Sequence, residues 1–129
     1  MMTLNSFNFN TTSGIRFGSG QAKDSCKEIF NKLGSRILFI TDKGLMSLGL
    51  TKPTIEEIKK MASVEVFDNV EADPSQKTLL KAIEIGKKFK TTGVIGFGGG
   101  SSMDVAKLSA LILGSNEDLE KAWGVANAK

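Results

Sequence analysis

Three consecutive glycines and two serines, Gly98-Gly99-Gly100-Ser101-Ser102, stand between a short apolar run and a longer one. Backbone without side chains can approach a ligand closely, and the first N–H groups of a helix have no partner inside that helix. Such a helix start favours an anion such as a pyrophosphate. The motif predicts a phosphate-binding turn, with a purely structural tight turn as the alternative, and a serine hydroxyl is expected to cap the helix.

Three aspartates stand close to this kind of chemistry. Asp42 directly follows an apolar run, where it is equally suited to accept a hydrogen bond from a ribose hydroxyl or to cap a helix. Asp73 stands in Asp-Pro-Ser, which is an ordinary helix start. Asp104 is expected in the first turn of the last helix, where its charge complements the dipole. The spacing matches neither G-x-G-x-x-G nor G-x-x-x-x-G-K-[ST].

The composition excludes several kinds of site. The 129 residues contain no histidine and one cysteine, so the chain cannot build a Ser-His-Asp triad, a Cys-His pair or a histidine metal site. We therefore assign no catalytic residue and no metal ligand within it. The net charge is +3, but the basic residues are scattered among acidic ones, so no nucleic-acid partner is predicted. No run approaches the roughly 18 apolar residues of a membrane span, no signal peptide is evident, and one cysteine suits a cytoplasmic location.

Hydrophobic periodicity predicts the elements that must position these residues. A two-stranded hairpin is expected over 7–17, followed by a helix over 22–33 whose apolar face buries Cys26. The remaining order is strand 36–41, helices 43–48 and 53–61, strand 64–67, a helix through 79–89, strand 94–97 and helix 102–113. Alternating strands and helices predict an α/β fold, a Rossmann-like parallel sheet flanked by helices with an N-terminal β-hairpin. Ligands bind at the carboxyl ends of such strands, where the topology brings together Asp42, the loop that contains Asp73, and the glycine turn.

Four segments resemble one family. The segment "IGFGGGSSMDVAK" closely resembles the GGGS-x-x-D-x-A-K signature of the iron-containing (group III) alcohol dehydrogenases. In the same order as in that family, "IRFGSGQ", "FITDKGLMSLGL" and "VFDNVEADPS" resemble its early strand and turn, its V-T-D-K-g-l segment and its F-D-x-V-x-P-N-P-T segment. The resemblance covers essentially the whole chain and keeps the spacing.

The resemblance implies which residues hold the cofactor. Asp42 corresponds to the aspartate that contacts the adenosine ribose, which implies NAD rather than NADP. The glycine-serine turn corresponds to the pyrophosphate site, and Asp73 stands where the family has an asparagine near the cofactor. The predicted cofactor-binding residues are Asp42, Asp73, Gly98, Gly99, Gly100, Ser101, Ser102, Met103 and Asp104.

The resemblance also implies an activity for the parent protein, a metal-dependent hydride transfer between NAD and a small alcohol or aldehyde. In the family, iron or zinc is held by one aspartate and three histidines of a second, all-helical domain, which this sequence lacks. Residues 1–129 are thus expected to form a truncated NAD-binding domain, inactive alone, that pairs as a homodimer through the hairpin Phe7 to Phe17. The alternatives are a stand-alone nucleotide- or phosphate-binding module and the glycerol dehydrogenase and dehydroquinate synthase branch, against which the spelling "SSMDVAK" argues.

Overall fold

A three-stranded parallel sheet forms the centre of the molecule, and a computed structural model describes residues 12–115 of the chain. The strand order is β2-β1-β3, so β1 is central and pairs with both neighbours in parallel. The strands are β1 (Arg36–Ile40), β2 (Ser63–Phe67) and β3 (Gly93–Gly96). The helices are α1 (Gln21–Asp24), α2 (Cys26–Leu33), α3 (Lys43–Ser47), α4 (Lys52–Lys59), α5 (Gln76–Phe89) and α6 (Gly100–Ser115). The predicted Rossmann-like α/β fold is confirmed.

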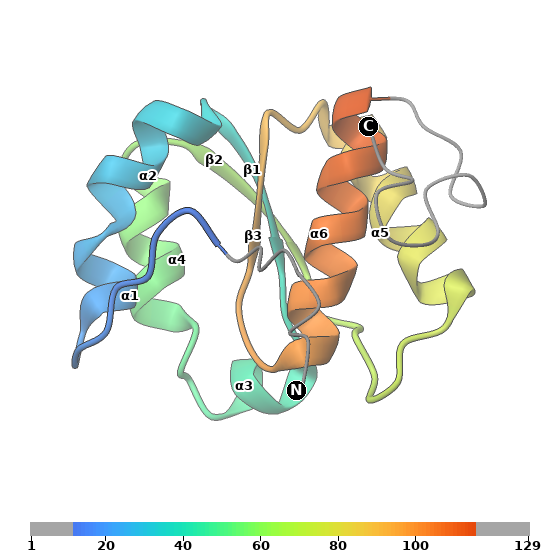
Figure 1. Cartoon of the computed structure of the whole chain (residues 1–129), viewed down its shortest axis with the longest axis horizontal. Coiled ribbons are helices and arrows are strands. Elements are labelled where there is room, and N and C mark those ends of the chain that lie inside the picture. The colour runs from blue at the N-terminus through green and yellow to red at the C-terminus, as the bar shows by residue number, and fades with distance from the viewer. Residues whose placement is uncertain (1–11, 116–129) are drawn as a thin grey trace, which may run out of the picture.

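Helices cover both faces of the sheet. Figure 1 shows α1, α2 and α4 on one side of the strands and α5 and α6 on the other. The central strand alternates between the two cores: Leu38 and Ile40 pack with α5 and α6, whereas Ile37 and Phe39 pack with α2 and α4. All four side chains are buried, which explains why this strand is an unbroken apolar run rather than an alternating one.

The helix predicted over 22–33 is divided in two at Ser25, which separates α1 from α2. Cys26 begins α2, is buried, and donates its S–H to the carbonyl oxygen of Ala22 at 3.2 Å. Burial, followed by the nearby carboxylates of Glu57 and Asp24, raises the pKa of this thiol, so it stays protonated. The prediction of a buried core thiol is confirmed.

The N-terminal hairpin is not seen within the described residues. The first strand of the predicted hairpin lies outside the described residues. Its second strand, over residues 15–17, is not formed in the structure. The side chains of Ile15 and Phe17 are almost fully exposed. Arg16 forms an ion pair with Glu28 of α2, which ties this segment to the body of the domain. The hairpin and its role in dimerisation stay predictions.

α6 packs closely on β3. A Cβ atom added at Gly96 of the strand would lie only 2.7 Å from the Cβ of Ala106, so a glycine is required there. Val105, Ala106 and Ile112 of α6 are buried, whereas Met103 and Ala110 are exposed. Among residues 12–115, no helix has the length and apolar content that crossing a membrane requires.

Candidate functional site

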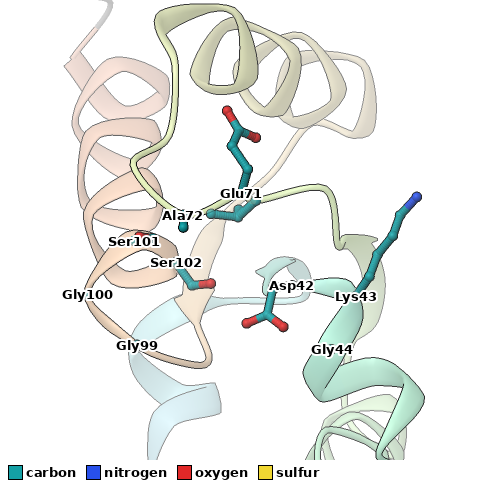
Figure 2. A pocket seen from close by; sticks show the side chains of 10 residues that line it. Asp42, Lys43, Gly44, Glu71, Ala72, Gly99, Gly100, Ser101 and Ser102 are labelled. Atoms are coloured by element: carbon teal, nitrogen blue, oxygen red, sulfur yellow. The ribbon is translucent and has the colours of Figure 1, made fainter.

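An open cavity of about 450 Å³ lies where the strands end at their carboxyl edge. Three segments that are far apart in the sequence form its walls (Figure 2): the start of α3, the loop after β2, and the start of α6. The lining residues are Asp42, Lys43, Gly44, Val70, Glu71, Ala72, Gly99, Gly100, Ser101 and Ser102. The sheet topology therefore brings Asp42 and the glycine-serine turn together, as the sequence predicts.

Within residues 12–115, no side chain caps the start of α6. The carbonyl oxygen of Gly99 accepts the N–H of Met103 at 3.1 Å, which makes Gly99 the residue at the cap position. Glycine has no side chain to offer, and Ser101 and Ser102 lie inside the first turn, so the prediction of a serine cap is wrong. The N–H groups of this turn have no intrahelical acceptors and lie at the cavity, which is the arrangement that binds an anion.

The three glycines of the turn have different roles. Gly98 has a φ of +142°, a value that residues with side chains rarely adopt. A Cβ atom added there would lie 3.0 Å from Leu45 Cδ1. At Gly99 and Gly100, an added Cβ would meet no atom of residues 12–115 within 4 Å. Gly98 thus shapes the turn, whereas the space beside Gly99 and Gly100 is open and can admit a ligand against the backbone.

Asp42 caps α3 at the opposite wall. Its Oδ1 accepts the N–H of Leu45 at 2.9 Å, so the predicted role as a helix cap is confirmed. A backbone bridge pairs Asp42 with Asn69 and so joins this wall to the loop after β2. For Oδ2 the structure gives no hydrogen-bond partner among residues 12–115, and Figure 2 shows the carboxylate directed into the space between α3 and the glycine turn. One oxygen is therefore oriented by the cap while the other can receive a ligand hydroxyl.

The sequence placed the loop after β2 at this edge through Asp73, but it did not single out residues 70–72, which form the third wall. The Val70 side chain is buried in the hydrophobic core, while the Glu71 side chain is directed towards α5 (Figure 2). The N–H of Ser75 donates to Glu71 Oε1 at 2.9 Å, and the Thr78 hydroxyl donates to the same carboxylate. These two bonds, in that order of effect, lower the pKa of Glu71 to about 2. The carboxylate is therefore ionised at neutral pH.

Five of the nine predicted cofactor residues line the cavity: Asp42, Gly99, Gly100, Ser101 and Ser102. The other four, Asp73, Gly98, Met103 and Asp104, do not line it. Their roles stay predictions.

Two of these four residues have clear local explanations. Asp73 has a φ of 54°, a left-handed conformation that aspartate and asparagine tolerate better than most residues. Asp104 lies beyond the first turn of α6 and pairs with Lys107 at 3.8 Å, so its prediction as a first-turn acid is wrong. Both are explained without a ligand.

Five lining residues were missed: Lys43, Gly44, Val70, Glu71 and Ala72. The signal for the first two is their position directly after Asp42 at the end of a strand. For the others it is their position directly before Asp73-Pro74, in the loop that follows β2.

The described part of the chain offers no cluster of three or more His, Cys, Asp or Glu side chains that could hold a metal ion. The polar groups of the cavity are instead donors, the helix N–H groups and two serine hydroxyls, and one acceptor, the Asp42 carboxylate. This set fits a ligand in which a phosphate group lies next to a ribose, as in a dinucleotide.

Comparison with known proteins agrees with this geometry. Residues 12–129 match the sequence pattern of the family described as iron-containing alcohol dehydrogenase. Choline dehydrogenase of Bacillus subtilis (strain 168) is 36% identical over 121 residues, which cover 90% of this chain and 30% of that protein.

Two crystal structures have the same fold. NADH-dependent butanol dehydrogenase A from Thermotoga maritima superposes with a TM-score of 0.80 at 28% identity, over 92% of this chain and 30% of that one. Sulfoacetaldehyde reductase from Bifidobacterium kashiwanohense, in complex with NAD+, superposes with a TM-score of 0.76 at 27% identity, over 94% of this chain and 32% of that one. This chain spans between 21% and 30% of the length of curated relatives that it matches. Since the family pattern matches residues 12–129, the chain belongs to the iron-containing alcohol dehydrogenase family.

Proposed function

We propose that this chain is the NAD-binding part of a metal-dependent alcohol dehydrogenase, which transfers a hydride between the nicotinamide and a small alcohol or aldehyde. The observation that carries the proposal is the uncapped start of α6, which faces Asp42 across one cavity. An open helix start suits the pyrophosphate, and a carboxylate across from it suits a ribose. We propose residues 1–129 as one cofactor-binding unit.

The pyrophosphate would lie against Gly99 and Gly100. Both positions leave open space beside the backbone, so phosphate oxygens can reach the first N–H groups of α6. The hydroxyls of Ser101 and Ser102 line the same space and can donate further hydrogen bonds. Hydrogen bonds to a charged group contribute about 1.5–3 kcal/mol each, so two such bonds give this turn a large share of the binding.

Asp42 would hold the adenosine ribose. Its Oδ2 can accept from a ribose hydroxyl, because Oδ1 is already engaged by the Leu45 N–H. A phosphate on that ribose, as in NADP, would be repelled by the negative charge of Asp42. We therefore propose NAD rather than NADP as the cofactor.

The bound NAD would supply the hydride chemistry, and the residues of this chain bind and orient it. Iron or zinc would be held by residues outside this chain, because 129 residues without histidine lack the ligands that the family resemblance implies. The donors seen here serve the dinucleotide alone. Accordingly, we expect weak NAD binding and no turnover from the 129-residue chain.

An NMR titration of the isotope-labelled 129-residue chain with NAD+ tests the site. We expect the amide signals of 99–102 to shift and the Gly99→Val variant to lose these shifts. The valine side chain would enter open space rather than clash with the protein, so the fold should survive. Gly114→Val is the matched control, since its Cβ also meets no atom of the described residues within 4 Å and it lies near the other end of α6. NAD+ binding, weak or tight, that Gly99→Val leaves unchanged would overturn the site.

We also propose that two chains associate through the N-terminal segment. Within the described residues, Ile15 is 80% exposed and Phe17 is 101% exposed, and apolar side chains in this state favour a partner. Light scattering should find a dimer that Phe17→Ser weakens. A monomer at all concentrations would contradict the proposal.

A further inference from the structure

The loop wall of the cavity, residues 70–72, is held at both of its ends. On one side, the backbone of Asn69 bridges to Asp42, and Val70 is buried in the core. On the other side, Asp73 adopts a left-handed conformation that turns the chain towards α5. Between these ends, Glu71 is part of the wall, and its carboxylate is directed away from the cavity, towards α5 (Figure 2).

That carboxylate fastens the wall to the start of α5. Its Oε1 accepts the N–H of Ser75 at 2.9 Å and the hydroxyl of Thr78 at 2.6 Å. Ser75 separately caps the helix, because its hydroxyl oxygen accepts the Thr78 N–H at 3.2 Å. The helix start is thus already capped locally, and Glu71 adds a connection that links the loop to the helix.

We infer that Glu71 is a positioning residue for the cofactor: it holds the 70–72 wall in the place that NAD binding requires. The inference rests on the proposed NAD site and deepens it. Glu71 acts through the backbone of the wall rather than through a contact with the ligand. A wall that is ordered before binding spares the ligand the free-energy cost of ordering it, so its loss appears as weaker binding.

A purely structural role for Glu71 makes a different prediction. If the carboxylate only stabilised α5, its removal would lower the unfolding temperature and leave the NAD affinity of the folded protein unchanged. If it positions the wall, the affinity falls even at a temperature where every variant is fully folded. Affinity measured under that condition, with folding checked by circular dichroism, separates the two roles.

The experiment uses NMR titration of NAD+ into four variants of the 129-residue chain. Glu71→Ala removes the connection, and we expect roughly five- to tenfold weaker binding. Thr78→Val removes one donor from the other side, with a smaller loss of roughly two- to fivefold. Glu71→Gln keeps an oxygen at the position that receives both donors, so it should restore affinity to within about twofold of the parent. Glu84→Ala is the control, because Glu84 is an exposed carboxylate on the same helix, paired with Lys88 at 3.2 Å.

The outcomes separate this inference from the proposed function. If the parent chain shows no NAD-dependent shifts at 99–102, the proposed function is overturned, and this inference with it. If the parent binds there and folded Glu71→Ala binds equally well, this inference alone is overturned. A loss in Glu71→Ala that Glu71→Gln restores, with Glu84→Ala unchanged, supports it.

Discussion

Two helices that point their N-termini to the same side of the sheet, α5 and α6, begin in opposite ways. At α5, the Ser75 hydroxyl caps the first turn, and the carboxylate of Glu71 in the preceding loop accepts the N–H of Ser75. At α6, the cap position is Gly99, which has no side chain, and the first turn faces the cavity. One helix start is closed by the protein's own oxygens, and the other is left open.

The difference separates stability from function. A closed helix start satisfies its N–H groups within the protein and so stabilises the fold. An open start leaves the same groups to water or to a ligand, which lowers stability but creates a binding site. α3 lies between these cases, because Asp42 closes its start with Oδ1 and keeps Oδ2 directed into the cavity. Exchanging these features between the helices tests the comparison.

The largest effect is expected from closing α6. Gly99→Asp places a carboxylate at the cap position, where it can accept N–H groups of the first turn and repel a phosphate. We expect NAD affinity to fall roughly 100-fold, the equivalent of two lost charge-assisted hydrogen bonds. The free energy of unfolding should rise by about 0.3 kcal/mol. NMR titration and urea denaturation measure the two effects, and a variant that binds like the parent would show that α6 is not the anion site.

The next largest effect is expected from the Asp42 carboxylate, which both caps α3 and faces the cavity. Asp42→Asn keeps a good cap for the helix but removes the charge that faces the ribose. The preference for NAD+ over NADP+ should fall by roughly tenfold, about 1.4 kcal/mol, because one repulsion between charges is lost. Parallel titrations with the two dinucleotides give this ratio. An unchanged ratio, in a protein that still binds NAD+, would remove Asp42 from cofactor selection.

A smaller effect is expected from opening α5. Ser75→Ala removes the hydroxyl cap and should lower the free energy of unfolding by about 1 kcal/mol. The Ser75 N–H still reaches Glu71, so NAD affinity should stay within about twofold of the parent. Ser75→Asp, which keeps a cap, is the control for urea denaturation. A large loss of affinity in Ser75→Ala would mean that the local cap, and not Glu71, holds the wall.

The smallest effect is a pH dependence at α5. Hydrogen bonds from Ser75 and Thr78 lower the pKa of Glu71 from 4.5 to about 2 in the folded chain. The stabilisation by this carboxylate is therefore fully present above pH 4.5 and is lost as the pH falls towards about 2.

The matched variant is Glu71→Gln, which keeps the geometry but cannot titrate. Over this range, the parent should lose stability more steeply than Glu71→Gln. Thermal unfolding of both proteins at a series of pH values measures the difference. Glu28 and Glu57, whose pKa values are also lowered, are present in both proteins and cancel. Parallel curves for the two proteins would contradict the role of the ionised carboxylate.

Much of this fold could be predicted because its signals are local. The unbroken apolar run of β1 indicates a strand buried on both faces, and the glycines and serines that follow β3 indicate a turn into a helix. Connections between parallel strands then require the strand ends to meet at one edge. For this reason Asp42 and the glycine turn could be placed together from residues more than fifty positions apart.

The details of helix starts could not be predicted. A serine near a helix start is a good cap by propensity, yet α6 begins earlier, at Gly100, and its serines fall inside the first turn. The helix boundary depends on how α6 packs on β3, with Ala106 against Gly96, and this is a tertiary contact. Glu71 was missed because its partners, Ser75 and Thr78, are brought to it only by the turn at Asp73.

The amino-acid sequence by itself determined the α/β class, the order of strands and helices, and a glycine turn suited to a phosphate, because hydrophobic period and backbone freedom are local properties. Only the tertiary structure decided which helix start is open and which is closed. That outcome depends on where each helix begins and on whether the loop before it folds so that a nearby carboxylate reaches its first N–H groups, as Glu71 does through the turn at Asp73.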